Sequence, residues 1–438
     1  MTPQELMDQI QSGPEELRLD FPLRFRRRTR SNPCSFDDLL EALQANRTIR
    51  QARCHNHVEL GITESEWCRL VRTLGSIWGL KKLEVVWQSG SHGFHPLQVV
   101  ARAVDSANSL HELTIIASDS EQSDPAGEVS LAQSLRQHGT LDSFGLTATM
   151  RTTATPRSPQ LIAAAACLRQ VIIVNHSLTS DDVRCLSRSL SLNELCLVGS
   201  VEGWLVIADE IRNGYFRPKT LVLVRTTAYS ALETAEAIQV MLGAIQCNGS
   251  LRKLNLHSTT GFSDEMGVAL AKALTVNTTM VWIDLQNTFT TSNPAFLPSQ
   301  PPKTLGAEAY KAFIAMLKIN MNIRLKLPNL KSDADFEARM QHSLMRIELQ
   351  LNSADRGSLV TSNQTTREEW VHTFQRLNDS CKNDGASFHL SCVYSMLQRN
   401  PGLCQTGATA PILGSTSLTP QSANHRNWKM RDLSGKGQ

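Results

Sequence analysis

The sequence lacks any long apolar run. No uninterrupted apolar stretch of about 18 residues occurs among its 438 residues. The opening segment, MTPQELMDQIQSGPEEL, contains no apolar core of the kind found in secretory signal peptides. We therefore expect a soluble protein in the cytoplasm, with the nucleus as an alternative location.

Short motifs of common catalytic sites are also missing. The sequence contains no GxxxxGK[ST] phosphate loop, no GxGxxG, no GxSxG and no HExxH. Nucleotide-switch proteins, common serine hydrolases and zinc hydrolases depend on such motifs. We therefore expect no enzymatic activity and no cofactor.

Cysteine pairs with the spacing of metal or redox sites are absent too. The ten cysteines are scattered without a CxxC pair, which favours buried free thiols. The one cluster of ligand-type residues is CHNH, from Cys54 to His57. On a strand, His55 and His57 would share one face and Cys54 would point to the other, so the three could not converge on one ion without a bulge. We predict no metal site.

What the sequence does contain is a recurring apolar triad, with two residues and then one residue between its members. This spacing predicts a strand, because residues two apart point to the same face. Between triads, apolar positions recur at three and four, which predicts a helix with one buried face. The triads begin about every 30 residues, at Ile49, Leu80, Leu110, Leu141, Leu168, Leu192, Pro218, Leu251, Met280, Asn322 and Leu344, with an earlier candidate at Pro14.

Repeated strand–helix units predict a solenoid, because a single unit cannot bury its own apolar face and must stack on its neighbours. The run from 263 to 285, SDEMGVALAKALTVNTTMVWIDL, resembles leucine-rich repeat proteins of the ribonuclease-inhibitor type. The resemblance covers about residues 14–349. It implies a curved α/β horseshoe with parallel strands on the concave face and helices on the convex face. The asparagine that the family carries after each triad is mostly absent or shifted here, as at Asn175 and Asn287.

We divide the chain into four parts. Residues 1–35 form an N-terminal capping segment, and residues 36–330 form the solenoid, with a proline-rich insertion at 288–304. Residues 331–404 form the last repeat and a helical cap, and residues 405–438 form a disordered tail rich in Thr, Ser, Gly and Gln. The cap resembles a terminal segment of uncharacterised microbial eukaryotic leucine-rich repeat proteins. Helix starts are predicted at Ser35, Thr63 and Ser180, each followed by acidic residues.

The residues two, four and six positions after the first member of each triad form the predicted concave face. Charged residues occupy its ends, for example Lys82, Glu84 and Glu112 towards the N-terminus, and apolar residues occupy its middle. An apolar centre bordered by charge and an aromatic ring is typical of a protein-binding surface. The predicted partner-binding residues are Ile172, Val174, Cys196, Val198, Val222, Val224, Lys253, His257 and Trp282. The alternative is that loops of the chain, or a second copy in a homodimer, cover this patch.

These observations predict a non-enzymatic scaffold that binds a partner protein on its concave face. Two alternatives remain open. Similar arrays activate Ran-type GTPases, although no motif carries residues of that activity to this chain. The basic run from Arg24 to Arg30 would support weak nucleic-acid binding, but a net charge of +3 is too small to argue for it alone. Ribonuclease inhibition would favour an acidic groove, whereas this face mixes in Lys82, Lys253, Arg324 and Lys326.

Overall fold

The computed structural model describes residues 3–19, 35–87, 96–117, 124–148, 158–174, 178–199, 201–224, 231–257, 263–285, 305–327 and 336–353, with short pieces at 372, 375–376 and 392–394. The chain divides into one compact unit, Met1–Cys392, and a second, Val393–Gln438. All elements named below belong to the first unit.

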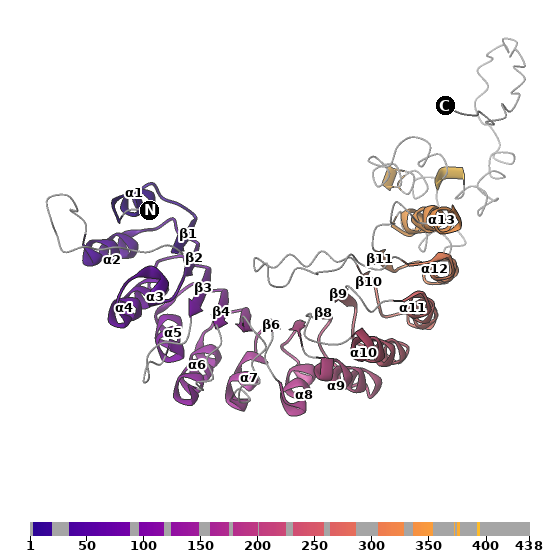
Figure 1. Ribbon diagram of the computed structural model, residues 1–438, viewed down its shortest axis with the longest axis horizontal. Helices are drawn as coiled ribbons and strands as arrows, with labels where there is room; N and C mark the ends of the chain where they lie inside the picture. Colours follow the sequence, from indigo (N-terminus) through magenta and orange to yellow (C-terminus); the bar gives the residue numbers. More distant parts are fainter. Residues whose placement is uncertain are drawn as a thin grey trace, which may run out of the picture. The chain divides into compact units, whose positions relative to one another are not determined.

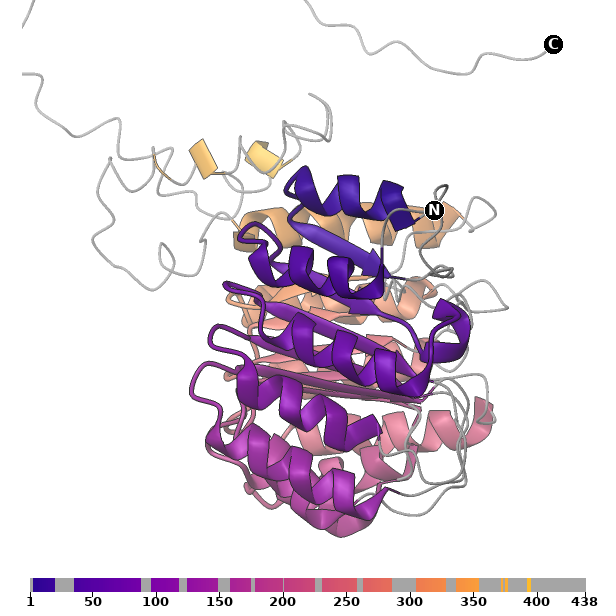
Figure 2. The same ribbon diagram turned by 90° about the vertical axis from the view of Figure 1, so that its left-hand side faces the viewer.

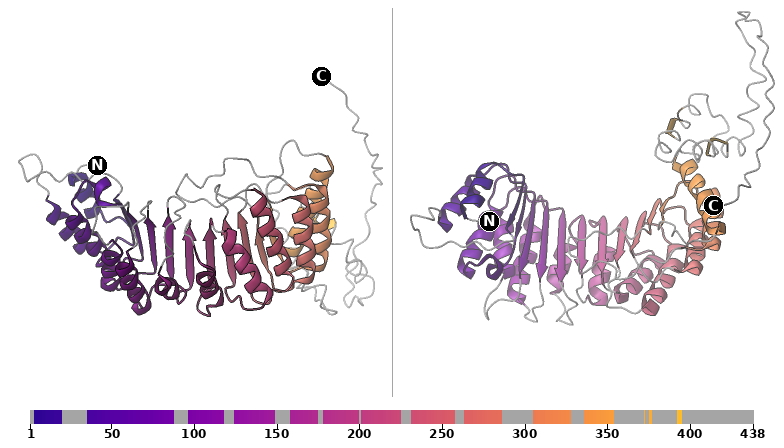
Figure 3. Two further views of the ribbon diagram at one scale, coloured as in Figure 1. Left: turned by 60° about the horizontal axis from the view of Figure 1, so that its bottom comes forward. Right: turned by 45° about the horizontal axis from the view of Figure 1, so that its top comes forward.

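Eleven strands within the described residues form one parallel sheet, and they follow one another in chain order (Figure 1). Figure 3 shows these strands side by side, with the helices along one side of the sheet. The strands are β1 (Glu16–Leu19), β2 (Gln51–Cys54), β3 (Lys82–Trp87), β4 (Glu112–Ala117), β5 (Ser143–Ala148), β6 (Gln170–Val174), β7 (Glu194–Val198), β8 (Thr220–Val224), β9 (Lys253–His257), β10 (Trp282–Asp284) and β11 (Arg324–Lys326).

Helices connect successive strands and cover one side of the curved sheet, which is its convex side (Figures 1 and 2). They are α1 (Pro3–Gln11), α2 (Phe36–Ala45), α3 (His57–Leu60), α4 (Glu64–Gly75), α5 (Pro96–Ser106), α6 (Pro125–Gln137), α7 (Pro159–Ala165), α8 (Ser180–Arg188), α9 (Val201–Arg212), α10 (Ala231–Ile245), α11 (Asp264–Val276), α12 (Ala307–Ile319) and α13 (Phe336–Ser353). The predicted fold class, an α/β solenoid with strands inside and helices outside, is confirmed.

One continuous core lies between the strand layer and the helix layer. The two strand members of each triad point into it, and pairs such as Leu113 with Ile115 and Leu254 with Leu256 are at most 3% exposed. Burying such a side chain contributes roughly 1.5–3 kcal/mol. Because each repeat places two or three of these residues in the same layer, the stability of the array grows by addition of repeats.

Hydrogen-bonded caps fix several helix starts, as predicted. The side chains of Ser35 and Thr63 each accept a hydrogen bond from the backbone N–H three residues on, and an acidic side chain accepts from the cap in return. α8 begins at Ser180, but Ser180 is not its N-cap as predicted. Thr179 is the cap, because an acidic residue, Asp182, then stands three positions later and completes the reciprocal pair.

Asparagines also lie before several triads, at the ends of the preceding helices, as at Asn46, Asn277 and Asn320. The amide of Asn277 donates to the carbonyl oxygens of Ile245 and Asn248, at 2.7 and 3.1 Å. Its carbonyl oxygen accepts from the backbone N–H groups of Thr279 and Met280. Each such asparagine thus satisfies buried backbone groups at the turn that leads from a helix into the next strand. The same donation to the preceding repeat recurs at Asn46, Asn320 and Asn352.

Two details of the last repeats correct the sequence prediction. The triad predicted to begin at Leu344 lies within α13, whose buried residues Ala338, Met345 and Asn352 recur at helical spacing. The first two triad members are three residues apart, a spacing that also places two residues on one face of a helix, so the spacing alone was ambiguous. Just before β11 the exposed Asn322 is not the core residue of its triad, because the buried Ile323 takes that place.

Several predictions concern segments outside the described residues. These are the basic run from Arg24 to Arg30, the proline-rich insertion at 288–304, most of the helical cap after 353, the tail at 405–438, and both Asn175 and Asn287. Among the residues that are described, no helix is both long and apolar enough to cross a membrane.

Candidate functional site

The parallel register arranges the concave side chains in rows that run across the sheet. Residues about 30 apart in sequence become direct neighbours, as Trp282 does with Lys253 on one side and Arg324 on the other. Neighbouring strands lie about 4.8 Å apart, so side chains in one row are within contact distance. The concave face is therefore a regular array whose chemistry changes from one end of the sheet to the other.

Charged side chains at the N-terminal end of this face pair with one another. Lys82 Nζ lies 2.7 Å from Glu112 Oε1, and Arg53 Nε lies 3.2 Å from Glu84 Oε1. All four side chains are at most 36% exposed. The charges thus neutralise one another across strands β2 to β4, and this end of the face has little net charge.

Hydrogen bonds continue the same row into the middle of the sheet. Ser143 Oγ donates to Gln170 Oε1, and Gln170 Nε2 donates to Glu194 Oε1, both at 3.0 Å. These contacts join β5, β6 and β7 on the concave side. The polar row is therefore largely satisfied within the chain over these repeats.

The predicted apolar patch is present, but it is a buried cluster rather than an open surface. Val174, Cys196, Val198, Val222 and Val224 are only 2–6% exposed and form an apolar cluster separate from the main core. Ile172 packs against this cluster and is partly exposed. The structure therefore brings the six apolar residues together, as predicted. Of these six residues, only Ile172 is exposed enough for a partner to contact it without displacing other atoms.

The thiol at the centre of this cluster is inert. Burial, together with the nearby charge of Glu194, raises the pKa of the Cys196 thiol to about 12. Burial likewise raises the pKa of the Cys54 thiol. Both thiols therefore stay protonated at neutral pH, and neither is a nucleophile or a ready metal ligand.

The CHNH stretch is arranged differently from the strand that was predicted. β2 ends at Cys54, and His57 begins the short helix α3, so His55 and His57 do not share a strand face. The His55 imidazole instead contacts the carboxylate of Glu59. Within the described segments, no group of three or more His, Cys, Asp or Glu side chains could hold a metal ion.

The C-terminal end of the concave face has a different character. Lys253 and Arg324 are exposed and flank the half-buried Trp282 on neighbouring strands. Among the described residues, neither of these two cations forms an ion pair. Lys326 lies with its Nζ 5.0 Å from the centre of the Trp282 ring, a distance typical of a cation–π contact, and 3.7 Å from the Asp284 carboxylate.

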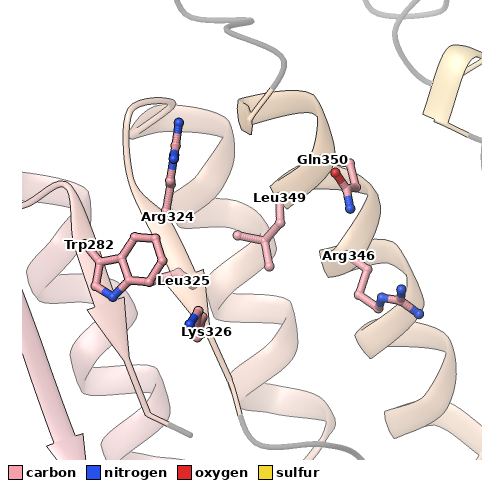
Figure 4. A pocket seen from close by; sticks show the side chains of 7 residues that line it. All are labelled: Trp282, Arg324, Leu325, Lys326, Arg346, Leu349 and Gln350. Atoms are coloured by element: carbon pink, nitrogen blue, oxygen red, sulfur yellow. The ribbon is translucent and has the colours of Figure 1, made fainter. Parts of the chain in front are cut away.

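A pocket of about 250 Å³ opens at this end, between the last two strands and α13. Figure 4 shows Trp282 on β10 and Leu349 on α13 facing the pocket from opposite sides of β11. The residues that line it are Trp282, Arg324, Leu325, Lys326, Arg346, Leu349 and Gln350. Aromatic, aliphatic and cationic side chains thus meet in one hollow.

Of the remaining predicted partner-binding residues, two lie at the C-terminal end of the concave face and one has a side chain that the structure does not describe. Lys253 and Trp282 lie together here, as stated above. His257 ends β9 opposite Val224, but its side chain lies outside the description. The prediction missed the contribution of α13, since Leu349 was assigned to a strand. The apolar residues Ala338, Met345 and Leu349, which recur at helical spacing in the sequence, were the signal that could have shown the pocket wall.

Comparison of the chain with protein-family models gives no match, and comparison with curated proteins gives no significant match.

Proposed function

We propose that this chain is a leucine-rich repeat protein of the ribonuclease-inhibitor type, acting in the cytoplasm as a non-enzymatic scaffold that binds a partner protein on its concave face. The repeat type is supported by the alternation of one strand with one full helix, as in β9, α11, β10 and α12. A strand ladder holds side chains in fixed positions before binding, which lowers the entropy lost on association.

One observation carries the proposal, namely the contrast in charge pairing along the face. Lys253 and Arg324 are exposed and have no counter-charge among the described residues, whereas Lys82 and Arg53 are paired. Two cations that flank an aromatic ring give a favourable free energy of binding to a partner of complementary charge. The proposed contact surface is therefore the C-terminal end, around Trp282, rather than the buried valine cluster.

Affinity capture from lysate of the source cells tests this surface. Three baits are compared. They are the intact chain, a concave variant with Lys253→Glu and Arg324→Glu, and a control with Lys272→Glu and Lys318→Glu. The control cations are exposed on α11 and α12 in the same repeats, but on the convex side. We expect a partner that the intact chain and the control both retain and that the concave variant loses.

Capture by all three baits alike would reject the concave face as the contact surface. A captured small GTPase would favour the regulator alternative. No described side chain supports that alternative or nucleic-acid binding through Arg24–Arg30, so we propose neither. Circular dichroism and urea midpoints of the three proteins must agree for the comparison to count.

A further inference from the structure

We propose that the C-terminal end of the concave face binds an acidic segment of a partner protein, with one apolar residue of that segment seated in the pocket beside Trp282. This inference rests on the proposed function and specifies the chemistry of the partner. It concerns Lys253, Arg324 and Lys326 as the charge-binding residues, and Trp282, Leu325 and Leu349 as the apolar walls.

The charge balance of this end favours an anion. Lys253 and Arg324 lie one strand to either side of Trp282, which places them about 10 Å apart across the sheet. Lys326 adds a third cation next to the ring, and Asp284 is the one acidic side chain in the same row positions of β9 to β11. Because Asp284 is buried and already contacts Lys326, the two flanking cations keep their charge available to a partner.

The pocket itself favours an apolar side chain rather than a second charge. Its lining includes the Trp282 ring, Leu325 and Leu349, together with the side chains of Arg324, Lys326, Arg346 and Gln350. A volume of about 250 Å³ accommodates one or two side chains and not a folded element. A buried aromatic or aliphatic anchor surrounded by polar contacts is the usual arrangement of a binding hot spot.

Nucleic acid fits these observations less well. Base stacking needs an open aromatic face, whereas Trp282 is half-buried and Lys326 lies over its ring. A phosphate backbone that followed the concave face beyond this end would also meet the carboxylates of Glu84, Glu112 and Glu194. An acidic protein segment can end where the cations end.

The tail of this chain is not the occupant that the charges select. Residues 405–438 contain one acidic residue, Asp432, together with Arg426, Lys429, Arg431 and Lys436. A basic segment would be repelled by Lys253 and Arg324. The tail therefore does not supply the acidic segment that would complement this surface.

Selection from a phage-displayed library of random dodecapeptides tests the proposal. The targets are the full chain, its Arg324→Glu variant, its Trp282→Ala variant and the convex control Lys272→Glu. We expect the intact chain and the control to enrich peptides of net negative charge that contain an aromatic or aliphatic residue. Arg324→Glu should abolish that enrichment, and Trp282→Ala should remove the preference for the apolar residue.

Affinity for the most enriched peptide, labelled with fluorescein, gives the quantitative readout. Fluorescence anisotropy should show a loss of about tenfold or more with Arg324→Glu, equal to about 1.4 kcal/mol, and little change with Lys272→Glu. The affinity should also fall as salt rises, because exposed charges make the contact.

Each other outcome overturns the inference in a recognisable way. Enriched peptides that are neutral or basic, but are still lost with Arg324→Glu, would reject the acidic partner and leave the concave-face function intact. Peptides that bind Arg324→Glu as tightly as the intact chain, or no enrichment at all, would reject this site. A twelve-residue thymidine oligonucleotide that binds more tightly than the best peptide, and competes with it, would show that the surface is a nucleic-acid site instead.

Discussion

The two ends of the concave face are built on the same strand ladder but use charge in opposite ways. At the N-terminal end, Lys82 and Glu112 occupy paired positions on adjacent strands and neutralise each other. At the C-terminal end, the equivalent row places Lys253, Trp282 and Arg324 side by side without a carboxylate among them. The backbone therefore fixes where the side chains stand, and the residue type at each position decides whether an end is closed on itself or open to a partner.

The repeats between these ends follow neither pattern. On β6, β7 and β8 the middle and last concave positions are apolar, and all of them except the partly exposed Ile172 are buried, so they form a second small core on the inner side of the sheet. This cluster separates the paired end from the unpaired end. Four predictions test the contrast, from the largest expected effect to the smallest.

A charge placed in the inner cluster should destabilise the protein most. Val198 is 2% exposed, so Val198→Glu would bury a carboxylate without a partner. We expect a loss of at least about 3 kcal/mol in the free energy of unfolding. Urea denaturation followed by circular dichroism measures it. Ile172→Glu is the matched control at the partly exposed border of the cluster, and equal losses for both variants would contradict the buried assignment.

Loss of a buried asparagine should come next. Asn277→Ala removes the amide that donates to the carbonyl oxygens of Ile245 and Asn248, each of which keeps one other donor, and it leaves the backbone N–H groups of Thr279 and Met280 without their acceptor. We expect a loss of about 2–3 kcal/mol, because unmet buried polar groups carry the desolvation cost. Asn46→Ala, near the other end, should cost about 1 kcal/mol, since Asn46 is half-buried. The reverse order of the two effects would count against this account.

Acidification should weaken the C-terminal end through His342. Burial, and next the charge of Arg346, lowers the pKa of His342 below its usual value near 6.5. The neutral ring packs edge-on against Tyr310, with ring centres 5.3 Å apart. His342 therefore binds a proton more readily in the unfolded chain than in the folded chain. The stabilising contribution of the neutral ring is present above about pH 6.5 and is lost as the pH falls through the folded-state pKa.

The measurement for this prediction is the urea midpoint between pH 7.5 and 5. Over that pH range the urea midpoint of the His342→Gln variant should fall less than that of the intact chain. The difference between the two falls should be smaller than the effect of Asn277→Ala on stability, because His342 is only half-buried. An equal fall in both proteins would show that other groups cause the pH dependence.

Removal of single concave lysines should give the smallest effects and the most direct comparison of the two ends. Lys82→Met breaks the pair with Glu112 and should cost about 0.5 kcal/mol at low salt, since both partners are partly exposed. Lys253→Met breaks no pair with a described residue and should leave the thermal midpoint unchanged. A larger loss from Lys253→Met than from Lys82→Met would show that the C-terminal cations are used internally.

Much of the fold could be predicted because the triad spacing encodes it directly. Residues such as Leu254 and Leu256 are two apart, so they must share a face of any strand that contains them. The same rule failed at Leu344, where the spacing also suits a helix and the surrounding turns of α13 decide the matter. The N-cap of α8, Thr179, was missed for a similar local reason, since Ser180 is also an acceptable cap by residue type.

The candidate site was less accessible to sequence reasoning. The prediction placed Val174, Val198 and Val222 on one face correctly, yet treated them as exposed, because periodicity reports which way a side chain points and not what surrounds it. The pocket beside Trp282 depends on α13, which lies more than 50 residues further along the chain. No local pattern near Trp282 announces that neighbour.

The sequence by itself determined the repeat, the strand and helix order, and the identity of the concave side chains, since all of these follow from spacing within a few residues. The tertiary structure alone decided which of those side chains are buried, which charges meet a partner, and where the pocket opens. The physical reason is that a parallel register brings together residues about 30 positions apart, and burial and ion pairing depend on those distant neighbours.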